Sequence, residues 1–124
     1  MIEIHPIRDR DKLKKLYMAK DVSYNEKSIA VIASDGDEVL GTCLFDLSEK
    51  EMTIHHISPT DDIMFADGIL RSALHVGVEN GIESAFYAET APEDLIKKLG
   101  FIKNTEKNEL NVELLFKSCG SCEK

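Results

Sequence analysis

The chain has 124 residues, 43% hydrophobic and 31% charged, which predicts a single globular domain with one core. Its 15 basic and 23 acidic residues give a formal net charge of −8 at neutral pH, so the surface should repel nucleic acid and anionic membranes. No segment has the apolar run that a membrane-spanning helix needs. Three cysteines do not pair evenly and the first residues lack a signal-peptide pattern, so we expect a cytoplasmic protein.

The first half of the chain predicts a strand, a helix and then three strands in succession. Ile2, Ile4 and Ile7 predict a short first strand that Pro6 breaks, and Asp9 or Asp11 can cap the helix after it. The apolar side chains of that helix share one face, at Leu13, Leu16 and Tyr17. Three apolar runs then predict antiparallel strands over residues 29–33, 39–47 and 52–57. The Asp35-Gly36 step between two of these runs predicts a hairpin, and Gly41 suggests a bulge or a close backbone approach.

A helix and a buried strand come next. Small and apolar residues recur with a period of 3.6, at Ala66, Ile69, Leu70, Ala73, Leu74 and Gly77. Gly81 can end this helix in a left-handed conformation. Residues 85–88 are short, apolar and aromatic, as a buried strand is. A strand, a helix and a second strand in this order predict a crossover unit whose two strands are parallel.

The end of the chain predicts one more helix and a long last strand. Thr90 and Glu93 are spaced as a capping box around Pro92, and Gly100 can end the helix that follows. Apolar residues then alternate at Leu110, Val112, Leu114 and Phe116. The complete order is β-α-β-β-β-α-β-α-β-β, which counts one further strand between the last helix and the long last strand. It predicts an α+β fold with one mixed, mostly antiparallel sheet and helices on both faces.

Three short motifs in this order resemble the GNAT superfamily of N-acetyltransferases along nearly the whole chain. A strand ends in Ile57-Ser58-Pro59, Gly68 lies near the start of the central helix, and a late helix ends in Leu99-Gly100-Phe101. The resemblance implies one GNAT-like domain over residues 1–117, acetyl-CoA as cofactor, and acyl transfer to the amine of a small molecule or a peptide. A homodimer is left open.

The resemblance also implies where coenzyme A would bind. The positions that match the family's cofactor site are Ile57, Ser58, Ala66, Asp67, Gly68, Ile69 and Arg71. In the family, backbone N–H groups at the start of the central helix hold the pyrophosphate. Here Phe65 and Leu70 replace residues of that loop, and Ile96 stands where many members have an acidic tyrosine. The loop also carries acidic side chains, at Asp61, Asp62 and Asp67.

The starting point of the central helix decides whether this loop survives, and the sequence leaves two alternatives. If Asp61 or Asp62 caps a helix that begins early, Gly68 lies inside the helix and no pyrophosphate cradle forms. If the helix begins near Asp67, the cradle persists with Arg71 as a substitute charge.

Three side chains are candidates for the base that deprotonates an acceptor amine. His55 and His56 lie on the fourth strand, and Glu89 follows the short parallel strand. Adjacent strand residues point to opposite faces, so we expect only one of the two histidines to face a given cleft. For each candidate the alternative is a structural role, as a hydrogen-bonded histidine or a solvated carboxylate.

The tail over residues 118–124 contains a Cys-x-x-Cys pair. Cys119 and Cys122 supply two thiols, whereas a structural zinc site needs four ligands, so we do not expect a bound metal. Cys43 lies within a strand and is expected in the core. Two functions therefore remain: an acyl-CoA-dependent N-acyltransferase, or a catalytically inactive GNAT-like binding or regulatory module, linked to metal or redox chemistry through the tail.

Overall fold

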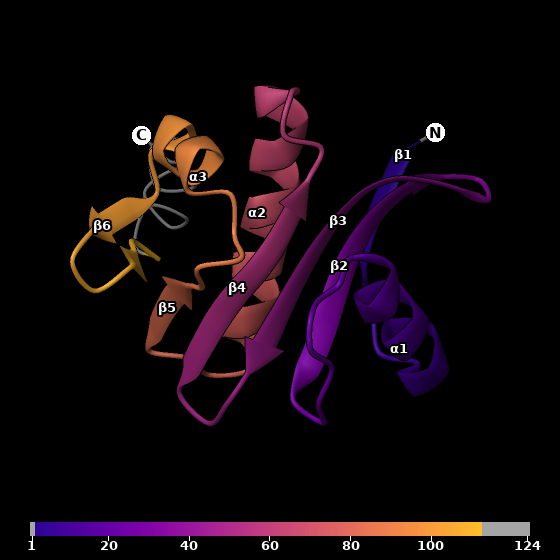
Figure 1. Ribbon diagram of the computed structural model, residues 1–124, viewed down its shortest axis with the longest axis horizontal. Coiled ribbons are helices and arrows are strands. Elements are labelled where there is room, and N and C mark those ends of the chain that lie inside the picture. Colours follow the sequence, from indigo (N-terminus) through magenta and orange to yellow (C-terminus); the bar gives the residue numbers. More distant parts are fainter. Residues whose placement is uncertain (1, 113–124) are drawn as a thin grey trace.

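A computed structural model describes residues 2–112 as one mixed sheet with helices on both of its faces (Figure 1). The strands are β1 (Ile2–Ile7), β2 (Ser28–Asp35), β3 (Glu38–Leu47), β4 (Glu51–Ser58), β5 (Ser84–Tyr87), β6 (Ile102–Asn104) and β7 (Glu109–Leu110). The helices are α1 (Arg10–Ala19), α2 (Ile63–Glu79) and α3 (Glu93–Leu99). The predicted order of elements is confirmed, but the predicted break at Pro6 is wrong, because β1 continues through Pro6, which pairs with Val31.

Within this part of the chain the sheet has seven strands in the order β1-β2-β3-β4-β5-β7-β6. Strands β4 and β5 are parallel, and the other neighbouring pairs are antiparallel. The predicted hairpin joins β2 to β3, with Gly36 at a φ of 63°. The predicted irregularity at Gly41 is also confirmed, because the β2–β3 register shifts beside it. A Cβ atom there would lie 2.8 Å from the carbonyl oxygen of Ser58.

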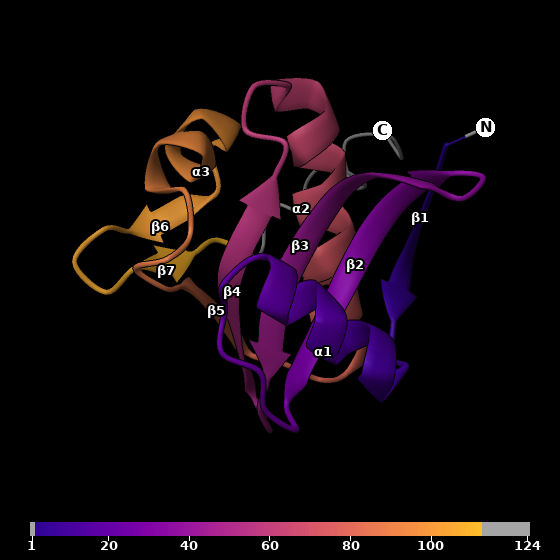
Figure 2. The same cartoon turned by 45° about the vertical axis from the view of Figure 1, so that its right-hand side comes forward.

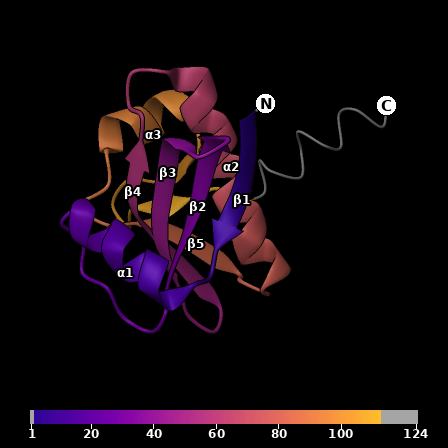
Figure 3. The same ribbon diagram turned by 90° about the vertical axis from the view of Figure 1, so that its right-hand side faces the viewer.

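The helices lie on opposite sides of the sheet, with α1 on one face and α2 on the other (Figures 2 and 3). The larger core fills the α2 side and includes side chains of β2 to β5, α2 and α3. A smaller cluster joins α1 to the other face through Leu13, Tyr17, Ala30 and Leu44. The buried hydroxyl of Tyr17 lies 2.7 Å from the carbonyl oxygen of Ile29 and 2.9 Å from that of Phe45. It therefore anchors α1 to two neighbouring strands.

Helix α2 begins at Ile63, so the first of the two alternatives for its start is observed. Asp62 is the N-cap, and its carboxylate accepts from the N–H of Phe65 at 3.1 Å. The N–H of Ala66 already donates to the carbonyl of Asp62 at 2.9 Å. The chain is therefore fully helical before it reaches Gly68. No described helix combines the length and apolar composition needed to cross a membrane.

Two local predictions for the end of the chain are wrong. The capping box at α3 does not form: its N-cap is Pro92 without a side-chain bond, while Thr90 and Glu93 bind other partners. The last strand is also shorter than the alternation predicts, because β7 ends at Leu110 and Val112 lies in a turn. The remainder of the predicted strand lies outside the described residues.

Candidate active site

The parallel strands β4 and β5 separate before β4 ends, which leaves an opening between them. Their pairing runs from Glu51↔Ser84 to Ile54↔Tyr87, and the N–H of Ala88 donates to the carbonyl of Ile54 at 2.8 Å. Strand β4 then continues to Ser58, whereas β5 has ended. Beyond Ile54 strand β5 no longer pairs with β4, so no described strand covers the β5-facing edge of residues 56–58.

A β-bulge in β4 directs both histidines to the same face of the sheet. Strand β3 pairs with His56 through Leu44 and next with Ile54 through Phe45, so His55 has no directly opposite residue. Both Ile54 and Ile57 are consequently buried in the core beneath α2. The expectation that the two histidines face opposite sides is therefore wrong. Because the bulge adds one residue, the next side chain after Ile54 that points into the core is that of Ile57, and His55 and His56 both point to the other face.

His55 is held by a carboxylate on the neighbouring strand. Its Nε2 lies 3.1 Å from Oδ2 of Asp46, and the other carboxylate oxygen accepts from the hydroxyl of Ser28 at 3.1 Å. Burial alone would raise the pKa of Asp46, but the hydrogen bond and charge of His55, with bonds from Asn25 and Ser28, outweigh it and lower the pKa. Asp46 therefore stays ionised and fixes the orientation of the His55 ring.

His56 has the properties of a neutral base. Burial, followed by the nearby positive charge of Lys20, lowers the pKa of His56 below its usual value. Its Nε2 is buried and has no hydrogen-bond partner among the described residues. Burying a polar atom without a partner costs about 1–3 kcal/mol, and such atoms often mark functional positions. His56 is thus kept neutral and its enclosed Nε2 is unpaired, whereas the Nε2 of His55 is already bonded to Asp46.

Glu89 lies at the rim of the opening. It stands between Ala88, bonded to Ile54, and Thr90, whose hydroxyl donates to the carbonyl of His55 at 2.9 Å. The Glu89 side chain is exposed and lines a hollow of about 270 Å³ with neighbouring residues of β5 and α3. The structure brings Glu89 near the bulge along the backbone, but no described bond joins it to either histidine.

The residues predicted to bind coenzyme A fall into two groups. Ile57 is in the core, and Ser58 lies at the end of β4 with its hydroxyl 3.0 Å from that of Thr42. The others lie within α2, beyond its first turn: Ala66, Asp67, Gly68, Ile69 and Arg71. Their helical position removes the cradle of free amides on which the prediction depended. Ala66 and Ile69 are in addition completely buried.

Arg71 is already engaged within the protein. Its guanidinium lies 2.8 Å from Oδ2 of Asp67, one helical turn earlier, and 5.0 Å from the centre of the Phe101 ring. A phosphate group would have to compete with the Asp67 carboxylate for this cation. Ile96, at the position of the family's acidic tyrosine, is completely buried.

Cys119 and Cys122, the cysteine pair considered as metal ligands, lie outside the described residues. Among residues 2–112 there is no group of three histidine, cysteine, aspartate or glutamate side chains placed to hold a metal ion. Cys43 is in the core as predicted, and burial raises the pKa of its thiol.

Sequence reasoning missed three residues around the bulge: Asp46, Lys20 and Thr90. A signal existed for Asp46, because a carboxylate between Phe45 and Leu47 interrupts an otherwise apolar strand. Lys20 acts on His56, and Thr90 bonds to the carbonyl of His55. Both interactions join segments far apart in the chain, so no local sequence pattern predicts them.

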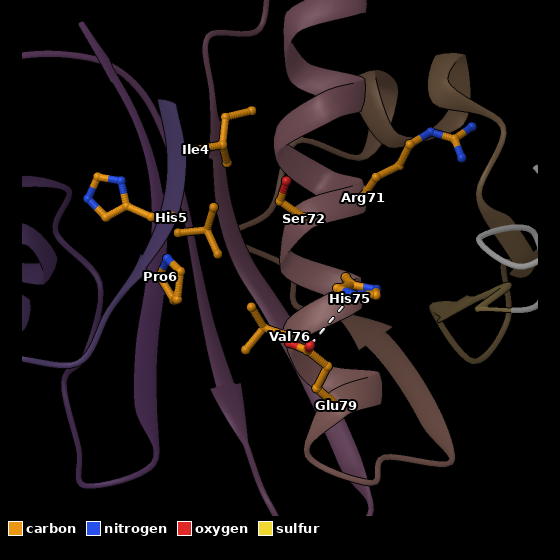
Figure 4. A pocket seen from close by; sticks show the side chains of 9 residues that line it. Ile4, His5, Pro6, Arg71, Ser72, His75, Val76 and Glu79 are labelled. Carbon is orange, nitrogen blue, oxygen red and sulfur yellow. Dashed lines mark ion pairs between the residues drawn. The ribbon is translucent and has the colours of Figure 1, made fainter. Parts of the chain in front are cut away.

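A separate hollow of about 390 Å³ lies between β1 and α2 (Figure 4). Its lining includes the apolar side chains of Ile4 and Val76. His5 points away from α2, while Arg71 and His75 point away from β1 (Figure 4). The polar groups do not converge, so the β4–β5 opening remains the better candidate site.

Comparison with known proteins identifies solved structures with a similar fold. No protein-family model matches the chain, and no curated protein matches it. Among solved structures it resembles a ribosomal-protein-alanine N-acetyltransferase from Brucella melitensis biovar Abortus 2308, with a TM-score of 0.59 and 16% identity over 85% of this chain and 93% of that one. A ribosomal-protein-S18-alanine N-acetyltransferase from Escherichia coli gives a TM-score of 0.57 and 12% identity, over 88% of each chain.

A third structure, a GNAT-family acetyltransferase from Streptococcus pneumoniae TIGR4, has a TM-score of 0.53 and 18% identity, over 82% of this chain and 88% of that one. The chain has the GNAT fold. The fold predicted from the order of its elements is thus confirmed, and the likeness extends over most of its length. The GNAT fold alone does not specify a substrate, so function must be argued from the opening and its side chains.

Proposed function

We propose that this protein is an N-acyltransferase that moves an acyl group from a coenzyme A thioester to an amine. The observation that carries the proposal is the β4–β5 opening with a neutral histidine beside its bulge, His56, whose Nε2 has no partner among the described residues. The three solved structures with the same fold are named as acetyltransferases, two of them as N-acetyltransferases, which supports this reaction type. Acyl transfer needs mainly two substrates held together and a base, and this arrangement offers both.

In the proposed reaction the thioester lies along the free edge of β4, where backbone N–H groups of residues 56–58 polarise its carbonyl. The acceptor amine loses a proton to His56, directly or through one water, and its nitrogen attacks the carbonyl carbon. The C–N bond forms, the C–S bond breaks, and the thiolate leaves. Since Ile96 cannot donate a proton, the thiolate takes its proton from water.

The acceptor is expected to be the amine of a small molecule or a peptide. Glu89 and Glu93 line the hollow of about 270 Å³ beside β5, and their acidic side chains favour the approach of a cationic amine. His55 has a positioning role in this proposal: the bond from Asp46 holds its ring, and its own carbonyl is held by Thr90.

A second candidate is a GNAT-fold module that binds a partner without catalysis. It is favoured by the early start of α2, which removes the amide cradle, and by the apolar residue Ile96 at the position of the family's acid. This candidate predicts a folded protein that binds no acyl thioester.

Thermal unfolding with and without acetyl-CoA separates the two candidates. At a hundred times its Kd a ligand adds about 2.7 kcal/mol to the stability of the folded state, which raises Tm measurably. The N-acyltransferase should show this rise, and mass spectrometry should detect acylated product from a panel of amines and peptides. An unchanged Tm with acetyl-CoA, longer acyl-CoAs and free coenzyme A would contradict the enzyme proposal.

A further inference from the structure

The two loops that follow β4 and β5, together with the first residues of the helices after them, carry only negatively charged side chains. Residues 59–67 and 88–94 contain six carboxylates and no lysine, arginine or histidine. The six are Asp61, Asp62, Asp67, Glu89, Glu93 and Asp94. A ligand held between β4 and β5 must leave the opening past these loops, because both connect the carboxyl ends of the same two strands to helices.

A hollow of about 430 Å³ lies between the two loops, and its charge is unfavourable for phosphate. Thr60 lines it from the first loop, and Glu93 and Asp94 line it from the start of α3. Lys98 is the one basic residue of this lining, against two carboxylates. A coenzyme A molecule brings about four negative charges in its nucleotide part, so this space repels that part.

The start of α2 is also unfavourable for the nucleotide. Asp62 occupies the N–H of Phe65, and the exposed side chains beside it are apolar, with Met64 86% exposed. The nearest guanidinium, that of Arg71, is bonded to Asp67. A carboxylate and apolar side chains at this helix N-terminus thus weaken its attraction for a phosphate group.

We infer that the acyl donor is recognised through its uncharged pantetheine arm, and that the nucleotide part of coenzyme A adds nothing to binding. This inference rests on the proposed function. The arm carries two amides and a thioester, which can bond the free edge of β4 without bringing charge near the loops. The donor class is therefore any acyl-pantetheine thioester, of which acetyl-CoA is one member.

The test compares acetyl-CoA with acetyl-pantetheine, which lacks the nucleotide, by titration calorimetry and by initial rates in the presence of a chelator. We expect Kd and KM values within about threefold of each other, whereas a working phosphate cradle would favour acetyl-CoA by about a hundredfold. Raising the salt concentration screens the repulsion, so it should leave the affinity for acetyl-CoA unchanged or improve it.

Charge reversal at the loops gives an independent test. In the Asp61→Lys/Asp94→Lys variant, acetyl-CoA should bind more tightly, by about tenfold, while acetyl-pantetheine binds as before. Glu49→Lys is the matched control: it is exposed on the β3–β4 turn, at the opposite end of β4, and should change neither donor.

The possible outcomes distinguish a failure of this inference from a failure of the proposed N-acyltransferase function. If acetyl-CoA binds tenfold or more tightly than acetyl-pantetheine, and salt weakens it, the inference is overturned and the N-acyltransferase proposal stands. If neither thioester binds or reacts, both are overturned. Similar affinities for the two donors, with the expected response to charge reversal, would establish the inference.

Discussion

The hydroxyl of Thr90 donates to the carbonyl of His55 at 2.9 Å, joining residues 35 positions apart. This bond lies one step beyond the last backbone bond between the two strand segments, from Ala88 to Ile54. It therefore marks the inner end of the opening. A thioester can reach β4 only beyond it, along residues 56–58, which places the reacting carbon beside the bulge.

Replacing His56 tests its role as the base. For His56→Gln we expect kcat to fall by about a hundredfold or more, while the Kd of the donor stays unchanged, because the imidazole takes the amine proton and does not hold the thioester. Steady-state kinetics and calorimetry measure the two quantities. His55→Gln is the comparison variant and should retain more activity. Equal losses in the two variants would contradict the assignment of the base to His56.

The pH dependence of the rate should report the lowered pKa of His56. A base works only when deprotonated, so kcat/KM should be constant at neutral pH and decline below the depressed pKa, which lies under about 6.5. In Lys20→Met the inflection should move to higher pH, since the neighbouring positive charge that disfavours protonation is removed. Lys14→Met, on the exposed side of α1, should leave the profile in place.

Asp46 should stabilise the fold in a pH-dependent way. Its pKa is lowered in the folded state, so its contribution is present above the unfolded pKa of about 3.9 and is lost as pH falls through the folded value. Asp46→Asn should therefore reduce the free energy of unfolding at pH 7 by about 1 kcal/mol. Urea titrations of both proteins should converge at acid pH. A difference that persists at the lowest pH would refute the ionic explanation.

Gly68 should be replaceable, although it is the glycine that matches the family motif. It lies inside α2, and an added Cβ would meet only Ile4 Cδ1, at 3.8 Å. Gly68→Ala should raise the free energy of unfolding by about 0.5–1 kcal/mol and leave donor binding unchanged. Gly41→Ala is the contrasting variant and should destabilise the protein, because its Cβ would press against the Ser58 carbonyl. Loss of donor binding in Gly68→Ala would show that this glycine still serves the cofactor.

The order of elements was predictable because each leaves a periodic trace in the sequence. The core face of α2 follows the 3.6 spacing from Ala66 to Gly77, and the Asp35-Gly36 step announced the first hairpin. Helix caps were less predictable. Thr90 and Glu93 fit a capping box, yet tertiary partners, the carbonyl of His55 and the hydroxyl of Tyr87, engage both side chains.

The candidate site was predictable in its residues but not in its geometry. His56 was identified from its strand, whereas its shared face with His55 depends on the bulge. A trace of the bulge is present in the sequence, since the buried residues of β4 change spacing from two, between Met52 and Ile54, to three, at Ile57. The lone Nε2 of His56 and the charge of Lys20 arise from tertiary packing, so sequence alone could not supply them.

The cap at Asp62 has a consequence for how this fold could change its ligand. Because α2 starts at Ile63, the carboxylate of Asp62 lies at the positive end of the helix. It occupies the place where a phosphate group would otherwise bind. The opening and the anion site are thus separable modules of one scaffold. Unwinding a single turn of α2 would restore the anion site without disturbing the β4–β5 opening.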